Sequence, residues 1–314
     1  MKSLLLFPFA LLLSCSSVKK TDAQQDSGSQ MLNDVEVLSS DAYQGRKTGT
    51  KGAEMARTYI SGRFKQIGLK QYTSLSGYEQ AFNFKRGNAG DVSAINLIGY
   101  IQGLSDNVIV ISAHYDHLGV VKEEVFNGAD DNASGIGGLL RLAEHFSKNK
   151  PNNTIIFAAF DAEEMGLQGA KAFVEKPPVP LANIKLNINM DMIAHNDKGE
   201  LYACGTFKYP ELKKYFIIKN PDIKVLFGHD DPKLGNDDWT NQSDQGAFNA
   251  KNIPFLYFGV EDHKDYHKAT DEFVNINKTF YVNAVNAILD VANNIDKERD
   301  IQQVFREKLQ MKKQ

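Results

Sequence analysis

Cysteine is scarce in this chain of 314 residues, which contains only Cys15 and Cys204. Cys15 lies in an N-terminal segment where it has another use, described below, so Cys204 would have no partner within the chain. We therefore expect no disulfide. The length, together with a hydrophobic content of 42%, is sufficient for a large core.

The sequence also lacks an excess of basic residues. It has 36 Lys and Arg against 39 Asp and Glu, and its pI is about 6.2. No long basic run occurs before the last few positions, so the chain has no field that would attract a polyanion. We expect no nucleic acid among its partners. Because neither a repeat nor a linker divides the chain, we predict a single domain over residues 31–314.

The apolar run at the N-terminus, residues 4–13, is too short to span a membrane and fits the hydrophobic part of a signal peptide over residues 1–14. It ends in Leu12-Leu13-Ser14-Cys15, which resembles the bacterial lipobox, where the cysteine becomes lipidated. The resemblance implies an exported lipoprotein of the cell envelope, lipid-anchored to a membrane surface. An ordinary signal peptide with an incidental cysteine stays open as the alternative.

The residues after the predicted cleavage point are polar. Ser16 follows the cysteine, which favours the outer membrane, with the domain facing the periplasm or the cell surface. Residues 15–30 have no apolar periodicity and predict a flexible tether that begins at the lipidated cysteine.

The folded part alternates between two hydrophobic patterns. Short apolar runs predict strands at 94–101, 108–113, 154–160, 184–190 and 253–258. Helical spacing predicts helices at 52–69, 134–146, 167–174, 210–219 and 279–295. This alternation indicates an α/β domain with a mixed, mostly parallel central sheet sandwiched by helices. The polar, acidic stretch 228–245 predicts a long surface loop.

Acids and imidazoles follow four of these strands, and ligands of α/β sheets bind beyond the carboxyl ends of strands. The residues are His114, Asp116 and His117; Glu163 and Glu164; Asp191; and His267. Asp131, in a glycine-rich turn, joins them. Each has a plainer interpretation taken singly: a turn histidine, an acidic helix start or a helix cap. Their convergence on one crevice favours a single functional site.

The inventory is sufficient for two metal ions. Such a site needs a bridging carboxylate and about one histidine and one carboxylate for each ion. Asp116 lies two residues beyond His114 and is placed to accept its second ring N–H, which favours His114 over His117 as the ligand. His263 and His267 lie four residues apart, and composition does not choose between them.

Five motifs resemble, in order and spacing, the di-zinc aminopeptidases of metallopeptidase clan MH, family twenty-eight, which have a zinc-dependent exopeptidase fold. The motifs are Ser112-Ala113-His114-Tyr115-Asp116-His117, Gly128-Ala129-Asp130-Asp131-Asn132-Ala133-Ser134-Gly135, Asp161-Ala162-Glu163-Glu164-Met165-Gly166-Leu167, Asn189-Met190-Asp191 and Tyr266-His267. The family includes bacterial leucyl-type aminopeptidases and glutamate carboxypeptidase. The resemblance extends upstream to Leu38 and so covers nearly all of the predicted domain.

The resemblance implies two zinc ions bridged by Asp131. His114 and Asp191 would complete one ion, and Glu164 and His267 the other. Glu163 matches the general base, which takes a proton from the metal-bridging water. Tyr266 is a candidate donor to the developing oxyanion, with simple packing beside His267 as the alternative. The chain departs from the pattern at Gln245, where many relatives have histidine, which leaves the substrate pocket open.

The leading hypothesis is an exported metalloprotease, a zinc aminopeptidase that hydrolyses N-terminal residues from peptides. A carboxypeptidase or dipeptidase on the same scaffold would need cationic residues for the substrate carboxylate, and no arginine cluster is apparent. A glutaminyl cyclase would use one zinc, whereas the ligand set here is sufficient for two. A non-catalytic, receptor-like relative would be expected to lack a ligand or the base. A serine hydrolase at Ser134 lacks the glycine that a nucleophile elbow requires two residues earlier.

Overall fold

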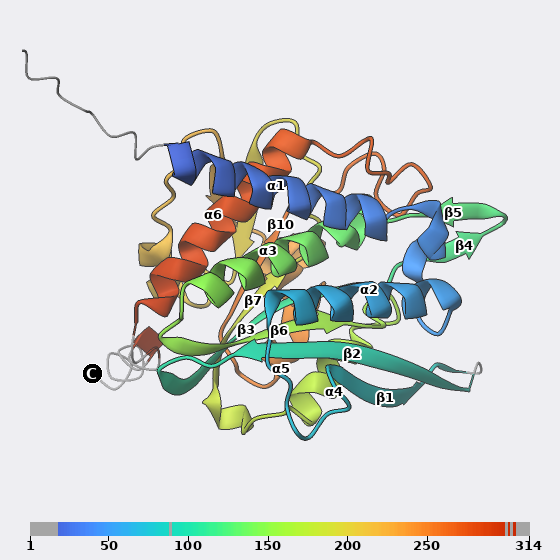
Figure 1. The fold of residues 1–314 in the computed structure, drawn as a ribbon, viewed down its shortest axis with the longest axis horizontal. Helices are drawn as coiled ribbons and strands as arrows, with labels where there is room; N and C mark the ends of the chain where they lie inside the picture. The colour runs from blue at the N-terminus through green and yellow to red at the C-terminus, as the bar shows by residue number, and fades with distance from the viewer. Residues whose placement is uncertain (1–17, 88–89, 299–300, 302–303, 306–314) are drawn as a thin grey trace, which may run out of the picture.

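The computed structural model describes residues 18–87, 90–298, 301 and 304–305, with the backbone alone described for residues 18–27. An eight-stranded mixed sheet lies at its centre, with the order β1-β2-β6-β3-β7-β10-β8-β9, and β4 pairs with β5 in a separate hairpin (Figure 1). The strands are β1 (Glu79–Lys85), β2 (Asp91–Ile101), β3 (Ser105–His114), β4 (Gly119–Val121), β5 (Glu124–Phe126), β6 (Asn153–Phe160), β7 (Ile184–Met190), β8 (Glu200–Cys204), β9 (Lys224–Phe227) and β10 (Phe255–Gly259). The α-helices are α1 (Val18–Leu38), α2 (Lys51–Ile67), α3 (Gly135–Lys148), α4 (Gln168–Glu175), α5 (Gln245–Ala250) and α6 (Lys278–Asp296). The predicted α/β class is confirmed.

The four central strands, β6, β3, β7 and β10, are mutually parallel. Antiparallel pairings join β1 and β2 to one side of this group and β8 to the other, and β9 then pairs parallel with β8. Parallel strands need crossover connections, which α3 supplies between β3 and β6 and α4 between β6 and β7. All four central strands therefore end at the same edge of the sheet.

Helices cover both faces of the sheet. Helices α1, α2, α3 and α6 cover one face, and α4 and α5 cover the other (Figure 1). Along β3, Ile109 and Ile111 pack into the first core and Val108 and Val110 into the second, because successive side chains of a strand point to opposite faces. A strand buried on both faces is a continuous apolar run in sequence, which explains why β3, β6, β7 and β10 were predictable.

Helix α2 illustrates how local sequence sets an element's bounds. The Thr50 side chain accepts a hydrogen bond from the backbone N–H of Ala53, which caps the N-terminus. Gly68 ends the helix with φ 86°, a left-handed conformation that glycine adopts at little cost. The prediction that Gly68 stops this helix is confirmed.

The prediction of a helix over 210–219 is wrong beyond its first residues. A 3-10 helix, Pro210–Tyr215, replaces it. The β-branched pair Ile217-Ile218 follows, and the backbone N–H of Lys219 donates to the Asp290 carboxylate of α6 at 3.0 Å. Tertiary hydrogen bonds thus replace those that would have extended the helix.

Segment 228–245 has no long element, as predicted for a surface loop. It contains the 3-10 helices Pro232–Asp237 and Trp239–Asn241. Strands β1, β8 and β9 and the β4–β5 hairpin were not predicted. These strands include exposed or half-buried residues, and most of them are short, so they form no continuous apolar run in the sequence.

The flexible tether predicted over 15–30 is corrected from Val18 onward, where the structure places helix α1. The buried residues Met31, Val35 and Leu38 lie on one face of this helix and pack into the core. Once these contacts fix the C-terminal part, each preceding residue adds a helical hydrogen bond at little further cost, since propagation is easier than nucleation. The weak apolar pattern of the preceding residues therefore hid the helix.

The predicted signal peptide and Cys15 lie outside the described residues. Within the described part of the chain, every helix is too short or too polar to cross a membrane. Cys204 is buried and carries a free thiol.

Candidate metal centre

The carboxyl ends of the four parallel strands bring the predicted residues together. His114 is the last residue of β3, Asp191 follows β7 directly, and Glu163 and Glu164 follow β6 by a short turn. The loop after β10 carries His267 to the same place. The structure thus groups all five ligands that the resemblance implies.

The first group of possible ligands is His114, Asp131 and Asp191, all of them buried. His114 Nε2 lies 3.2 Å from Asp191 Oδ1 and 3.5 Å from Asp131 Oδ1. Three ligand atoms at such separations face one point.

The second group adjoins the first through Asp131. His267 Nε2 lies 3.1 Å from Asp131 Oδ2 and 3.5 Å from Glu164 Oε2. The two oxygens of Asp131 therefore face different groups, Oδ1 toward His114 and Oδ2 toward His267. This arrangement is the one expected of a bridging carboxylate.

His117 also belongs to the second group, although the sequence favours His114 over it. Its Nδ1 lies 2.9 Å from Glu164 Oε1 and 3.6 Å from Asp131 Oδ2. Residues 115–118 have no regular structure, so strand alternation no longer decides where the His117 side chain points. The sequence favours His114 as the ligand, and in the structure both imidazoles lie at the centre.

The donor set fits zinc. Zn²⁺ prefers imidazole nitrogens and carboxylate oxygens. Such donor atoms lie within 4.8 Å of one another in His114, Asp131 and Asp191, and likewise in His117, Asp131 and Glu164. Glu164 Oε1 and both ring nitrogens of His117 are buried without a hydrogen-bond partner. Buried polar atoms are rarely left unpaired, so a cation between them would satisfy the donors and offset the buried carboxylate charge.

The carboxylate of Asp116 holds the glutamate turn. It accepts hydrogen bonds from the backbone N–H groups of Glu163, at 3.0 Å, and Glu164, at 3.3 Å. The sequence predicts that this carboxylate takes the second ring N–H of His114. The closer contact of His114 Nδ1 goes instead to the backbone oxygen of Asp116, at 3.1 Å, against 3.7 Å to the carboxylate. Asp116 is therefore a positioning residue for both His114 and the glutamates.

Asp271, which sequence reasoning missed, positions the bridging residue. Its carboxylate accepts hydrogen bonds from the backbone N–H groups of Asp130 and Asp131, at 2.8 and 3.0 Å. Burial raises the pKa of Asp271 to about 6, and the nearby Asp130 carboxylate acts in the same direction. An isolated aspartate in a loop gives no signal of such a role in the sequence.

Arg46, a second missed residue, is fully buried and binds four backbone oxygens. Its guanidinium donates to the carbonyls of Leu38, Tyr115, Asn127 and Gly128 at 2.6–2.8 Å. Burial lowers its pKa to about 10, so it stays charged at neutral pH among the surrounding carboxylates. One side chain thus joins α1 to the loops that carry Asp116 and Asp131.

Arg46→Met is expected to destabilise the fold by at least about 3 kcal/mol, because it leaves buried carbonyls without donors. Arg86→Met, at an exposed position, is the matched control and should stay within about 0.5 kcal/mol of wild type. Urea unfolding followed by circular dichroism measures both. Equal midpoints for the two variants would contradict this role of Arg46.

Glu163 and Tyr266 line a cavity of about 350 Å³ together with the ligands. Burial raises the pKa of Glu163 well above its usual value, His114 opposes this shift, and Asp191 adds to it. The Tyr266 ring stacks on His267 with 4.0 Å between ring centroids. Tyr266 therefore packs against His267 and also lines the cavity, and its role as a donor to the oxyanion stays a prediction.

Gln245, where the sequence departs from the family pattern, lies in a buried hydrogen-bond network. It accepts from the Asn189 side chain at 3.0 Å and donates to the Trp239 carbonyl at 2.7 Å. It is not among the residues lining the cavity of the metal centre. The neighbouring Asp244 is fully buried, and burial raises its pKa to about 7.

His263 belongs to neither of these two groups but to a separate one, with His195 and Asp265. Its Nε2 is 3.0 Å from Asp130 Oδ2, and its ring stacks on His195 with 3.9 Å between centroids. Of the two histidines that composition left open, the structure places His267 at the centre.

The fold and the site together define a class: an α/β protein with two adjoining candidate metal positions at the carboxyl edge of its sheet. The family follows from sequence. The chain belongs to peptidase family M28, whose family model matches residues 96–292.

Individual relatives are more distant. Leucine aminopeptidase 2 of Trichophyton rubrum is 29% identical over 202 residues, covering 56% of this chain and 39% of that protein. The chain spans about half or less of the length of the first curated relatives it matches.

Solved structures share the fold. A zinc aminopeptidase from Bacillus subtilis superposes with a TM-score of 0.64 at 16% identity, covering 84% of this chain and 94% of that one. A glutaminyl cyclase from Bacteroides thetaiotaomicron, bound to N-acetylhistamine, gives a TM-score of 0.65 at 18% identity, covering 86% and 97%. The predicted zinc-dependent exopeptidase fold is confirmed.

Proposed function

We propose that this protein is a zinc aminopeptidase that removes N-terminal residues from peptides and uses two zinc ions. The observation that carries the proposal is Asp131, whose two oxygens face two separate donor groups beneath a cavity lined by Glu163. Membership of peptidase family M28 supports peptide hydrolysis. The leucine aminopeptidase of T. rubrum and the zinc aminopeptidase of B. subtilis support the choice of the N-terminal end.

Each side chain has a part in this reaction. Zinc, when bound, would polarise the scissile carbonyl and acidify water. Glu163, in the cavity wall, takes the proton of the attacking water and passes it to the leaving amine. Tyr266, in the same wall, can donate a hydrogen bond to the oxygen that gains charge. Asp116 keeps the Glu163 backbone fixed and so holds the base in place.

The lining of the cavity favours an aminopeptidase over a carboxypeptidase. The described residues that line it include Asp131, Glu163, Glu164 and Asp191 but no lysine or arginine. Asp131, Glu164 and Asp191 would be neutralised by the zinc ions they hold, so the argument rests on the lack of lysine and arginine among these lining residues. A peptide's terminal carboxylate would need such cations.

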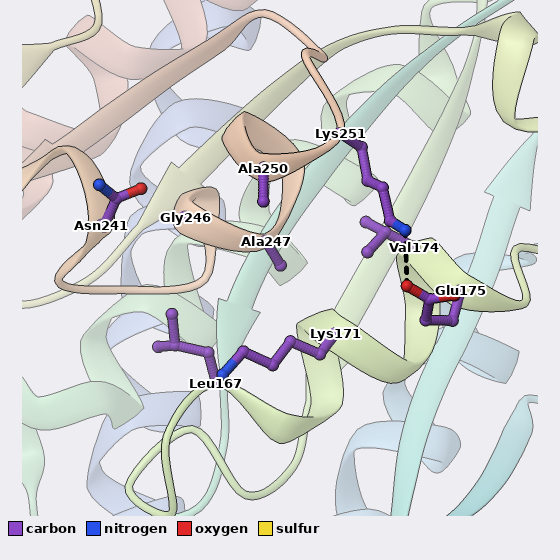
Figure 2. A pocket seen from close by; sticks show the side chains of 9 residues that line it. All are labelled: Leu167, Lys171, Val174, Glu175, Asn241, Gly246, Ala247, Ala250 and Lys251. Atoms are coloured by element: carbon purple, nitrogen blue, oxygen red, sulfur yellow. Dashed lines mark ion pairs between the residues drawn. The ribbon is translucent and has the colours of Figure 1, made fainter.

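A neighbouring pocket of about 410 Å³ between α4 and α5 contains lysines (Figure 2). There Lys251 pairs with Glu175 at 2.6 Å, and Lys171 donates to the Gly166 carbonyl at 2.9 Å. Both ammonium groups thus have partners within the protein, so this pocket does not favour recognition of a peptide carboxylate.

A peptide panel tests the direction of cleavage. A free N-terminal peptide should be hydrolysed, and its N-acetylated counterpart should lose about 100-fold in kcat/KM, the order expected when a charged hydrogen-bonding group is lost. A C-terminally amidated peptide is the matched control and should be cleaved as well as the free acid. Equal cleavage of acetylated and free peptides would rule out an aminopeptidase.

Glutaminyl cyclase activity is the second candidate, because a structure of that activity shares the fold. The two donor groups around Asp131 favour two ions rather than one. Incubation with an N-terminal glutaminyl peptide, followed by mass spectrometry, separates the outcomes. Loss of ammonia with the chain length unchanged indicates the cyclase, and loss of the first residue indicates the aminopeptidase.

We further propose that the protein is exported and lipid-anchored through Cys15 in the cell envelope. The lipobox-like Leu12-Leu13-Ser14-Cys15 supports this proposal. Expressed in a bacterial host, the wild-type protein should partition into Triton X-114 detergent, and Cys15→Ala should move to the aqueous phase because it carries no acyl chains. Identical partitioning of the two forms would contradict the anchor.

A further inference from the structure

His117 is a buried histidine that the family pattern leaves without a role. Its side chain has essentially no exposed surface, and neither ring nitrogen has a hydrogen-bond partner. A neutral imidazole buried without partners is costly, because its polar atoms lose hydration and gain nothing. The side chain therefore needs a partner other than those the protein supplies.

The contacts of His117 point to an ion. Its Nδ1 lies 2.9 Å from Glu164 Oε1, yet neither atom has a hydrogen-bond partner. The geometry of this short contact is therefore not that of a hydrogen bond. In a tetrahedral zinc site with bonds of about 2.0–2.1 Å, ligand atoms lie about 3.3 Å apart. The distances from Nδ1 to Glu164 Oε1 and Asp131 Oδ2, 2.9 and 3.6 Å, lie on either side of this value.

His267 completes the same set from the opposite side. Its Nε2 lies 3.1 Å from Asp131 Oδ2, the oxygen that also faces His117. The two imidazole rings are tilted by 57° with 5.9 Å between their centroids, so they do not stack and can both face an ion. Glu164 offers one oxygen to each ring.

Gly128 makes room for the His117 ring. A Cβ at this position would come within 2.6 Å of the His117 ring carbons, and the residue has φ 55°. The His117 ring therefore packs directly against the backbone of the glycine turn that leads to Asp131.

We infer that His117 binds the second metal ion through Nδ1, together with Asp131, Glu164 and His267. This inference rests on the proposed two-metal centre and assigns it a third imidazole. The second ion then has four protein ligands, whereas the first has three, His114, Asp131 and Asp191. A closed coordination shell is typical of tightly held ions, and a shell with an open position is typical of catalytic ones. The first ion is thus the more accessible to substrate.

Cadmium-113 NMR tests the inference without relying on activity. The protein, labelled with ¹⁵N in histidine and loaded with ¹¹³Cd²⁺ alone, should show three imidazoles coupled to cadmium. Two should couple through Nε2, from His114 and His267, and one through Nδ1, from His117. His117→Ala should lose only the Nδ1 coupling, and His145→Ala, at a histidine bonded to Asn293, should lose none.

The outcomes separate the two proposals. Two couplings, both through Nε2, in the wild-type protein would overturn the role of His117 and leave the two-metal centre intact. Absence of any coupling would overturn the centre itself. Because the wild-type spectrum alone distinguishes these results, a folding defect in His117→Ala would not affect the decision.

Chelation gives a second readout. When EDTA is added stepwise to the zinc-loaded protein, one ion should leave well before the other, because the four-ligand position holds its ion more tightly. In His117→Ala both ions should leave together, whereas two-step loss unchanged from wild type would contradict the assignment.

Discussion

Glu163→Gln is expected to lower kcat by about 10³-fold or more and to leave the metal content unchanged. The amide cannot accept the proton of water, and general-base catalysis contributes about 10²–10⁴-fold. Glu163 lines the cavity, and none of the three groups of possible ligands among the described residues contains it, so the ions should keep their ligands. Peptide hydrolysis and metal analysis on the same preparation measure the two effects.

The matched control is Glu124→Gln, at an exposed position in β5. It should retain wild-type rates. Wild-type activity in Glu163→Gln would refute the role of Glu163 as the base. Loss of metal from that variant would mean that Glu163, and not Glu164, is the metal ligand.

Asp131→Asn should lower the metal content of the protein from two ions toward zero and abolish hydrolysis. Its two carboxylate oxygens face the two groups separately, so the substitution weakens both positions at once. A neutral amide supplies a single, weaker oxygen ligand in place of a bridge. Inductively coupled plasma mass spectrometry after dialysis measures the content.

Asp191→Asn provides the informative contrast, because Asp191 belongs to the first group alone. That variant should keep close to one ion. Asp106→Asn, at an exposed position, should keep both. If Asp131→Asn lost no more metal than Asp191→Asn, Asp131 would not be a bridge.

The sequence predicted the strands that are buried on both faces of the sheet. β3, β6, β7 and β10 are buried on both faces, so their sequences are continuous apolar runs and the acids and histidines at their ends stand out. The edge strands β1 and β9 consist almost wholly of exposed and half-buried positions, and nothing distinguishes them from loops. The same pattern that revealed the centre of the sheet therefore could not reveal its edges.

The site was predictable to the extent that motifs carry it. The order and spacing of the motifs group His114, Asp131 and Asp191, and the folded chain places these three side chains within reach of one ion. The orientation of His117 was not predictable, because it depends on how the chain turns after β3.

The supporting residues were hidden for a different reason. Arg46 reaches carbonyls 69 to 82 residues away along the chain, and Asp271 accepts from amides about 140 residues away. Such partners are backbone groups, which have no sequence signature. Long-range hydrogen bonds to the backbone are thus the part of this centre that becomes visible only in three dimensions.

Anomalous diffraction from crystals of the zinc-loaded protein tests the central claim most directly. We predict two zinc peaks about 3.5–4 Å apart, as in two-metal sites generally, with one oxygen of Asp131 directed to each. A single peak, or two peaks that do not share Asp131, would contradict the account.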